Sequence, residues 1–234
     1  MVKNIAVIPA RSGSTRIKDK NIYPFKGKPL MAWTIEAAKK SGMFDKIIVS
    51  TDSEEYAEIG RNYGAEVPFL RDKYADNASS CALVAYYATK QAEEYFNESY
   101  DNITILQATC PLRDEHDIKK AVEFFNENNV KALITATTYN MNPWWGATLD
   151  ENKKPTFVLY SPEQCNSQSK PPMYCPNGAI AVVNKEYLEK TQSLYTDELR
   201  FSEMDWINSV DIDNYEDIDM AEVLFDFKNR KVNV

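Results

Sequence analysis

The chain has 234 residues with 27 lysines and arginines against 35 aspartates and glutamates, a net charge of −8 at pH 7. This balance excludes the broad basic face that nucleic-acid binding requires, although a few local cations can still hold a small phosphorylated substrate. Hydrophobic residues make up 44% of the sequence, enough for a packed core, and no apolar run reaches the roughly 18 residues of a membrane helix. We expect a single domain over residues 1–234, with neither nucleic acid nor membrane as a partner.

Cysteine and histidine usage argues against a zinc site. The four cysteines have no C-x-x-C spacing, and His116 is the one histidine, so a set of zinc ligands is hard to assemble. Isolated cysteines without a secretory signal are typical of the reducing cytoplasm, which is the location we expect.

Short β-branched runs alternate with helical periods in the first part of the chain. Helices are predicted at Pro29–Ser41, from Asp52 as N-cap to Gly64, and at Ser80–Phe96 and Asp114–Asn126. The alternation predicts an α/β fold, with a mostly parallel sheet, helices on both faces and ligands at the carboxyl ends of the strands. The strands are predicted at Asn4–Pro9, Lys46–Ser50, Glu66–Leu70, Ile103–Gln107 and Ala132–Thr137.

The alternation breaks over residues 139–175, which contain five prolines together with Trp144 and Trp145. This stretch is too long for a plain connection, and exposed aromatic residues suit a subunit contact. We therefore interpret it as an inserted segment that reaches another subunit; the alternative is a long loop folded on its own domain. A strand at Ile180–Asn184, an extended segment at Ile207–Asp213 and a helix at Asn214–Phe227 are predicted to follow.

The loop directly after the first strand, residues 10–21, concentrates groups that bind phosphate. Backbone N–H groups and hydroxyls can hold phosphate oxygens, and arginine and lysine neutralise their charge. The loop matches neither the Walker pattern nor the dinucleotide-binding pattern, which weakens those two interpretations. Its hydroxyls and cations are Ser12, Ser14, Thr15, Arg11, Arg16, Lys18 and Lys20.

Asp211 and Asp213 lie two residues apart on a segment predicted to be extended, so their side chains are expected to point the same way. Mg²⁺ takes one or two carboxylates and completes its shell with water and substrate phosphates. An acid pair of this kind is often only surface charge, but with the phosphate loop it predicts a metal site.

Three further motifs lie at expected strand ends or helix starts. Asn177 and Gly178 precede a strand, where an amide and a close backbone approach suit a polar ligand. Gln107 ends a strand, and Arg113 beyond it either binds an anion or pairs with the start of a helix. Ser79 is either a plain helix cap or a nucleotide contact.

These motifs in this order resemble the acylneuraminate cytidylyltransferases, including the enzymes for legionaminic and pseudaminic acids. The shared motifs are P-A-R-S-G-S-T-R-I-K-D-K-N, V-S-T-D-S, D-N-A-S-S, L-Q-A-T-C-P-L-R, P-N-G-A-I and S-V-D-I-D. The resemblance implies a Rossmann-like nucleotidyltransferase fold that transfers CMP from CTP to a nine-carbon 2-keto sugar acid with release of pyrophosphate. It also implies Mg²⁺, with Mn²⁺ as a possible substitute, and a homodimer joined through the inserted segment.

The resemblance also assigns roles to single residues. The catalytic residues would be Arg11, Lys20 and Asp211, and the metal ligands Asp211 and Asp213. The sugar-binding residues would be Gln107, Asn177, Gly178 and Lys170. The nucleotide-binding residues would be Ala10, Arg11, Ser12, Ser14, Lys20, Asn21, Arg71 and Ser79.

One stretch departs from the family pattern. Residues 165–175 lack two arginines that many members carry before P-N-G, and Lys170 would replace them in part, although lysine cannot make the same bidentate contact. The identity of the sugar acid therefore stays open. The alternatives are a cytidylyltransferase for the eight-carbon 3-deoxy-manno-octulosonic acid and a nucleotide-binding module without catalysis.

Overall fold

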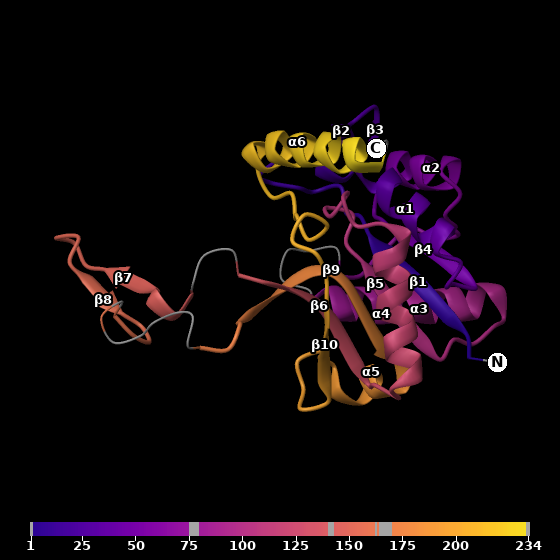
Figure 1. Ribbon diagram of the computed structural model, residues 1–234. Coiled ribbons are helices and arrows are strands. Elements are labelled where there is room, and N and C mark those ends of the chain that lie inside the picture. Colours follow the sequence, from indigo (N-terminus) through magenta and orange to yellow (C-terminus); the bar gives the residue numbers. More distant parts are fainter. Residues whose placement is uncertain (1, 75–79, 140–142, 162, 164–169, 233–234) are drawn as a thin grey trace.

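A six-stranded sheet forms the centre of the computed structural model, which describes residues 2–74, 80–139, 143–161, 163 and 170–232 (Figure 1). The strand order is β10-β6-β9-β5-β1-β4. Every neighbouring pair is parallel except the two pairs made by β9, so the predicted mostly parallel sheet is confirmed. The strands are β1 (Asn4–Pro9), β4 (Lys46–Ser50), β5 (Asn102–Leu106), β6 (Ala132–Thr138), β9 (Tyr174–Asn184) and β10 (Leu199–Glu203).

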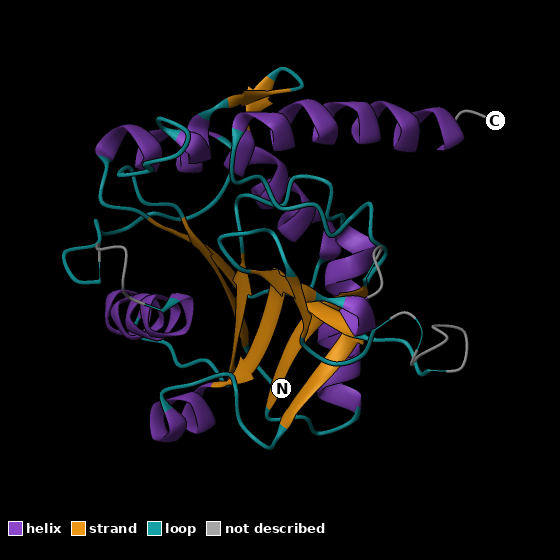
Figure 2. Cartoon of the chain, turned by 90° about the vertical axis from the view of Figure 1, so that its left-hand side faces the viewer, coloured by secondary structure: helices purple, strands orange, loops and turns teal. Residues whose placement is uncertain are grey.

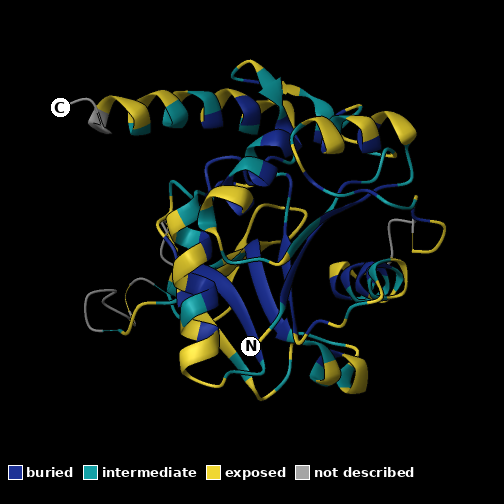
Figure 3. Ribbon diagram, turned by 90° about the vertical axis from the view of Figure 1, so that its right-hand side faces the viewer, coloured by how far each residue is buried: buried dark blue, intermediate teal, exposed yellow. Residues whose placement is uncertain are grey.

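Helices cover both faces of the sheet (Figure 2). Alternate side chains of β1 explain this, because Ala6 and Ile8 enter one buried cluster while Ile5 and Val7 enter another. These strand side chains are shielded from solvent, as the dark strands of Figure 3 show. The first cluster is closed by α1 (Leu30–Ser41), α2 (Glu54–Asn62) and α4 (Glu115–Glu127), and the second by α3 (Cys81–Phe96) and α5 (Lys185–Thr191).

A third buried cluster joins the two ends of the chain. Helix α6 (Tyr215–Val232) places Ile218 against Ile17 of the loop that follows β1. The same cluster includes Phe25 of the short hairpin formed by β2 (Pro24–Phe25) and β3 (Lys28–Pro29). Helix α6 therefore packs against the loop after β1 (residues 10–21) and fixes it at the edge of the sheet.

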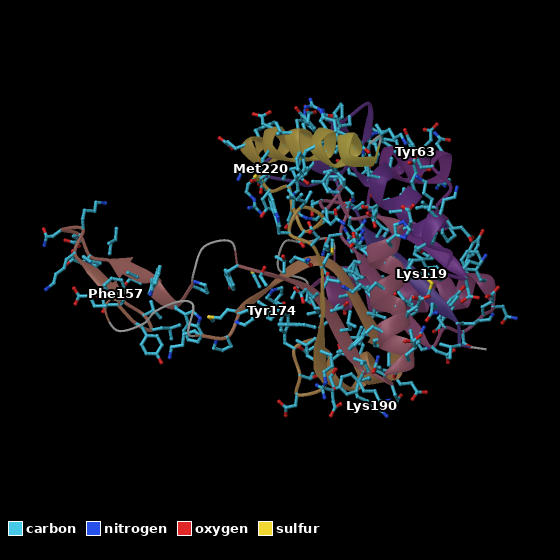
Figure 4. The ribbon with its side chains drawn as sticks, in the orientation of Figure 1. Tyr63, Lys119, Phe157, Tyr174, Lys190 and Met220 are labelled. Carbon is cyan, nitrogen blue, oxygen red and sulfur yellow. The ribbon has the colours of Figure 1, made fainter. Side chains whose placement is uncertain are left out.

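A hairpin projects from the body between β6 and β9 (Figure 1). It contains the 3-10 turn η2 (Pro143–Trp145) and the strands β7 (Ala147–Leu149) and β8 (Pro155–Phe157). We call residues 143–161 the arm. Phe157 lies on it and Tyr174 lies where β9 begins (Figure 4). Leu149 is 61% exposed and Val158 is 67% exposed, so the arm presents apolar side chains to solvent.

Several predicted elements differ from the structure. Residues 66–70 are not a strand; they make one isolated bridge, between Ile48 and Glu66. The predicted strand 180–184 begins much earlier, at Tyr174, since its first half pairs with the end of β6. Residues 206–209 form a turn, and 210–213 have no regular structure.

The capping prediction for the second helix is also wrong. Ser53, not Asp52, is the N-cap of α2, because its side chain accepts the hydrogen bond from Tyr56 N. Asp52 instead contacts the loop after β1, as described below. Strand β10 and helix α5 were not predicted, because short elements carry a weak periodic signal. In the described parts of the chain, no helix has the length and apolar character needed to cross a bilayer.

Candidate active site

A cavity of about 500 Å³ lies at the carboxyl edge of the sheet; we call it the cleft. It brings together the loop after β1 and the acid pair before α6, which are almost 200 residues apart in the sequence. Its lining residues are Pro9, Arg11, Ser14, Thr15, Arg16, Lys20, Asn21, Arg71, Tyr74, Cys81, Val84, Gln107, Thr109, Gly178, Asp211 and Asp213.

Asp52, which follows β4, fixes the loop after β1 (residues 10–21) through hydrogen bonds to Ser12. The Asp52 carboxylate accepts hydrogen bonds from Ser12 N at 2.8 Å and from Ser12 Oγ at 3.2 Å. Asn21 Nδ2 donates to the carbonyl of Arg11 at 2.9 Å, which fixes the other side of the loop. Ser12 is therefore engaged in shaping the loop, and Ala10 is fully buried with its N–H bonded to Ser50 O. Neither Ser12 nor Ala10 is among the described residues that line the cleft.

Lys20 is the most firmly placed cation of the loop. Its ammonium donates to the carbonyl of Ile212 at 2.8 Å and to the carboxylate of Asp213 at 3.0 Å. Its side chain is 14% exposed, whereas Arg16, which also pairs with Asp213 at 2.9 Å, is 64% exposed. A buried, hydrogen-bonded cation loses less of its field to solvent than an exposed one, so Lys20 supplies the stronger fixed charge.

The acid pair keeps the orientation expected from the sequence although its segment is not a strand. Ile212 is buried between the two aspartates, and its N–H donates to Thr109 O at 2.9 Å. Asp211 and Asp213 consequently both face the cleft. Cys110 Sγ lies 3.8 Å from Asp211 Oδ1, and burial, together with the charge of Asp211, raises the pKa of this thiol to about 12. The thiol therefore stays protonated and can donate to the carboxylate.

The two carboxyl groups have opposite pKa shifts. The pKa of Asp211 is raised, chiefly because the surrounding protein removes water from its carboxyl group and also because Asp213 is negatively charged. The hydrogen bond from Thr109 acts in the opposite direction but does not outweigh these causes. Burial also acts to raise the pKa of Asp213, but the hydrogen bond and charge of Lys20, with Arg16, outweigh it and lower this pKa. A cation that replaced part of the lost hydration would relieve the cost of ionising Asp211.

The carboxylates of Asp211 and Asp213 suit a magnesium ion that takes most of its other ligands from a substrate and from water. Among the described residues, no group of three or more His, Cys, Asp or Glu side chains is arranged to hold a metal ion. Two carboxylates are enough for Mg²⁺ when phosphate oxygens and water complete its shell. The pair Asp211 and Asp213 meets that requirement, whereas zinc would need a fuller set of protein ligands.

The opposite wall of the cleft comes from the segment after β4 and from α3. Arg71 is almost completely buried, and its backbone N–H donates to Thr51 O at 2.7 Å. It lines the cleft, as a nucleotide-binding residue would. Ser79 lies outside the described residues. Tyr74, Val84 and Cys81 also line this wall and were not anticipated, because uncharged residues in a loop or helix carry no motif.

A second cavity of about 270 Å³ adjoins the cleft. Both cavities are lined by Cys81, Gln107 and Gly178, so these residues stand where a ligand in one could meet a ligand in the other. Gln107 Nε2 lies 2.9 Å from Cys81 Sγ, and Gly178 has φ +69°, a conformation that other residues rarely adopt. The rest of the lining is Ser80, Ala82, Ile105, Ile134, Ala181, Gln192, Ser193, Leu194 and Tyr195.

Asn177 supports the site rather than lining it in the described part of the chain. Its side-chain oxygen accepts from Thr135 Oγ1 at 2.6 Å and from Ala179 N at 3.1 Å. Its side-chain nitrogen donates to Ser209 Oγ at 2.8 Å. The amide is thus used to fix the bend of β9 that presents Gly178.

Arg113 and Lys170 also differ from their predicted surroundings. Arg113, for which an anion or the start of a helix was the predicted partner, is buried, and its guanidinium donates to Gln107 O at 3.1 Å, Ala179 O at 2.9 Å and Thr34 Oγ1 at 2.6 Å. Lys170 lies at the arm, with its ammonium 4.7 Å from the ring centre of Tyr160. It is not among the described residues that line the cleft or the second cavity.

A mostly parallel sheet whose carboxyl edge carries a cationic, hydroxyl-bearing loop beside paired carboxylates suits the transfer of a nucleotidyl group. Residues 5–220 match the family described as Cytidylyltransferase, and the chain belongs to this family.

Named relatives cover nearly the whole chain. The chain is 33% identical over 225 residues to a pseudaminic acid cytidylyltransferase of Campylobacter jejuni, and the alignment covers 96% of this chain and 97% of the relative. It is 35% identical to an N-acylneuraminate cytidylyltransferase of Escherichia coli, covering 98% of this chain and 54% of that protein. A solved structure of a CMP:2-keto-3-deoxy-manno-octonic acid synthetase complexed with CTP shares the fold, with TM-score 0.71, 14% identity and coverage of 97% and 99%.

Proposed function

We propose that this enzyme activates a nine-carbon 2-keto sugar acid with CTP to give the CMP-sugar and pyrophosphate. The observation that carries the proposal is the pair of adjoining cavities, one charged and one largely apolar, which share Gln107 and Gly178. A triphosphate suits the first cavity, because the cations of the loop face it. The named relatives, which act on pseudaminic and N-acylneuraminic acids, support the second substrate.

The oxygen of the anomeric hydroxyl bonds to the α-phosphorus of CTP, and the proton of this hydroxyl passes to water. The bond between the α-phosphorus and the oxygen that bridges to the β-phosphate breaks, which releases pyrophosphate. Such transfers depend on positioning and charge neutralisation more than on covalent chemistry. Arg11 and Lys20 line the cleft where they can stabilise the departing pyrophosphate. Mg²⁺, or Mn²⁺ in its place, would be held by Asp211 and Asp213 and would neutralise charge on the phosphate oxygens.

The second cavity favours a sugar acid with apolar substituents. Ile105, Ile134, Ala181 and Leu194 contribute to its lining, and apolar walls gain most from methyl or acylamino groups. An eight-carbon acid without methyl or acylamino substituents would leave these walls in contact with polar groups. This comparison favours the nine-carbon class over the eight-carbon alternative.

A pyrophosphate-release assay tests the proposal directly. Purified protein, CTP and Mg²⁺ would be combined with sialic, legionaminic, pseudaminic and eight-carbon acids in turn, and each nucleoside triphosphate would be exchanged for CTP. We expect turnover with CTP and at least one nine-carbon acid. CTP binding by calorimetry without pyrophosphate release from any acid would instead support a binding module without catalysis.

The metal assignment has its own test. Asp211→Ala should lower turnover strongly and raise the Mg²⁺ concentration needed for half-maximal rate, whereas Asp219→Ala, on the exposed surface of α6, should leave both unchanged. Undiminished turnover of Asp211→Ala at limiting Mg²⁺ would remove the metal role of this residue.

We further propose that residues 139–175 are a dimerisation insertion and that the enzyme works as a cytoplasmic homodimer. The support is the arm, which extends away from its own domain and exposes Val158 and Leu159 (Figure 1). An apolar hairpin of this kind gains stability when a second subunit covers it. Cys81, Cys110 and Cys175 are free thiols, which fits a reducing compartment.

A further inference from the structure

The cleft has two chemically different ends. One end carries Lys20 and Asp213, joined by a hydrogen bond of 3.0 Å beneath α6. The other end is formed by Arg71 and by the start of α3. The backbone N–H of Arg71 is hydrogen-bonded to Thr51 O, directly after β4. A nucleoside triphosphate also has two different ends, because its charge is concentrated in the phosphates and its base is a flat, uncharged ring.

Tyr74 provides an aromatic side chain at the end that contains Arg71. It lines the cleft and is 41% exposed, so its ring is available to a ligand. Val84 of α3 contributes an apolar surface to the same wall. The Tyr74 backbone has φ +56°, a left-handed conformation that non-glycine residues seldom adopt without support.

That support comes from one residue of α3. The Tyr87 hydroxyl donates to the carboxylate of Asp72 at 2.8 Å. The ammonium of Lys73 lies 5.4 Å from the centre of the Tyr87 ring, and the ring of Tyr74 packs edge-on against it at 5.7 Å. Three consecutive residues of the segment thus contact the same side chain.

We propose that Tyr74 is a nucleotide-binding residue that contacts the base of CTP, and that Tyr87 is the positioning residue that holds it there. The proposal rests on the function proposed above and adds the identity of the wall that receives the base. An aromatic ring beside a base adds stacking and dispersion that the phosphates cannot use. The phosphate end and the base end therefore contribute to CTP affinity through different residues.

Binding measurements with three ligands separate the two ends. Calorimetry without sugar acid would give the affinity of CTP, CMP and inorganic tripolyphosphate for each variant. Tyr74→Ala should weaken CTP and CMP by about tenfold, the size of one lost base–aromatic stack, and leave tripolyphosphate within about twofold. Tyr74→Phe should bind like the unaltered protein, since the ring is retained.

Tyr87→Phe tests the positioning role, because it keeps the ring against Tyr74 and removes the hydrogen bond to Asp72. We expect a weaker CTP affinity than that of the unaltered protein but a smaller loss than in Tyr74→Ala, with kcat at saturating CTP preserved. Tyr95→Ala, an exposed tyrosine elsewhere on α3, is the matched control and should change none of these values.

The outcomes distinguish this inference from the proposed function. Unaltered protein that binds no CTP would overturn both. Normal CTP binding by Tyr74→Ala would overturn the inference alone, as would equal losses for CTP and tripolyphosphate, which would indicate a general disturbance of the cleft.

Discussion

The ammonium of Lys20 and the carboxylate of Asp213 lie 3.0 Å apart although 193 positions separate them in the chain. This ion pair brings the loop after β1 and the segment before α6 to the same side of the cleft. It also lowers the pKa of Asp213, so the aspartate is ionised at neutral pH. The site therefore exists only in the folded chain, where α6 has closed over the loop.

Replacing Lys20 should impair the reaction more than binding of the sugar acid. In Lys20→Met, the charge facing the phosphates is lost, and we expect kcat/KM for CTP to fall by about 100-fold or more, a typical effect of removing one group that stabilises developing charge. Lys18→Met is the matched control, since Lys18 is an exposed cation of the same loop outside the cleft lining. Steady-state pyrophosphate release measures both variants, and equal rates for the two would refute the role of Lys20.

Arg113→Met should destabilise the whole domain. The guanidinium donates to the carbonyl oxygens of Gln107 and Ala179 and to the Thr34 hydroxyl, and a hydrogen bond that involves a charged group contributes about 1.5–3 kcal/mol. We expect the free energy of unfolding in urea to fall by about 3 kcal/mol. Arg200→Met, an exposed site, should change it by less than about 0.5 kcal/mol. Similar values for both variants would contradict this account.

The half-buried pair Glu93 and Lys185 should make stability depend on pH in the acid range. Burial acts to raise the pKa of Glu93, but the hydrogen bond from Lys185, with further bonds from Tyr100 N and Lys90, lowers it below 4.5. Because the pKa is lower in the folded state, the pair stabilises the protein above the unfolded value. The stabilisation is lost as pH falls through the folded value.

Lys185→Met should therefore lower the free energy of unfolding near pH 7, and the difference from the unaltered protein should shrink in acid, as pH falls through the lowered pKa of Glu93. Lys90→Met removes a half-exposed partner of the same carboxylate and should have a smaller effect. Urea unfolding at pH 7 and in acid gives both values, and a difference that stays constant with pH would show that the ion pair is not responsible.

Charges placed on the arm should separate the proposed dimer. Val158→Asp combined with Leu159→Asp introduces two carboxylates where apolar contact is expected, so sedimentation should report a monomer with an intact fold by circular dichroism. The matched variant Val223→Asp alters an exposed apolar residue of α6 and should leave the dimer unchanged. A dimer that persists in the arm variant would exclude this surface as the interface.

The sequence predicted the elements with strong local signals. The helix over 29–41 begins after Pro29 and ends at Gly42, whose φ of +65° is the left-handed cap that the glycine suggested. The loop at 10–21 and the acid pair were expected to share a site, and the structure places Arg11, Lys20, Asp211 and Asp213 in one cleft.

Features that depend on distant residues could not be predicted in this way. Asp52 has the pattern of a helix cap, yet it binds Ser12 because the first two parallel strands bring their carboxyl ends together. The second cavity is lined by residues 192–195, which carry no charged motif and reach the site only through the antiparallel course of β9. The support of Tyr74 by Tyr87 likewise requires α3 to lie beside a loop.

Strand β9 runs against its neighbours, and Thr138 is paired with Tyr174 in the ladder. The polypeptide that leaves the sheet after Thr138 therefore returns at Tyr174, at the carboxyl end of β6 and so at the same edge of the sheet as the cleft. A longer, shorter or different hairpin could be exchanged at this point without disturbing the register of the strands. A partner bound by such a hairpin would therefore lie at the edge of the sheet that carries the cleft, so changes in assembly and changes in substrate access would be coupled during evolution.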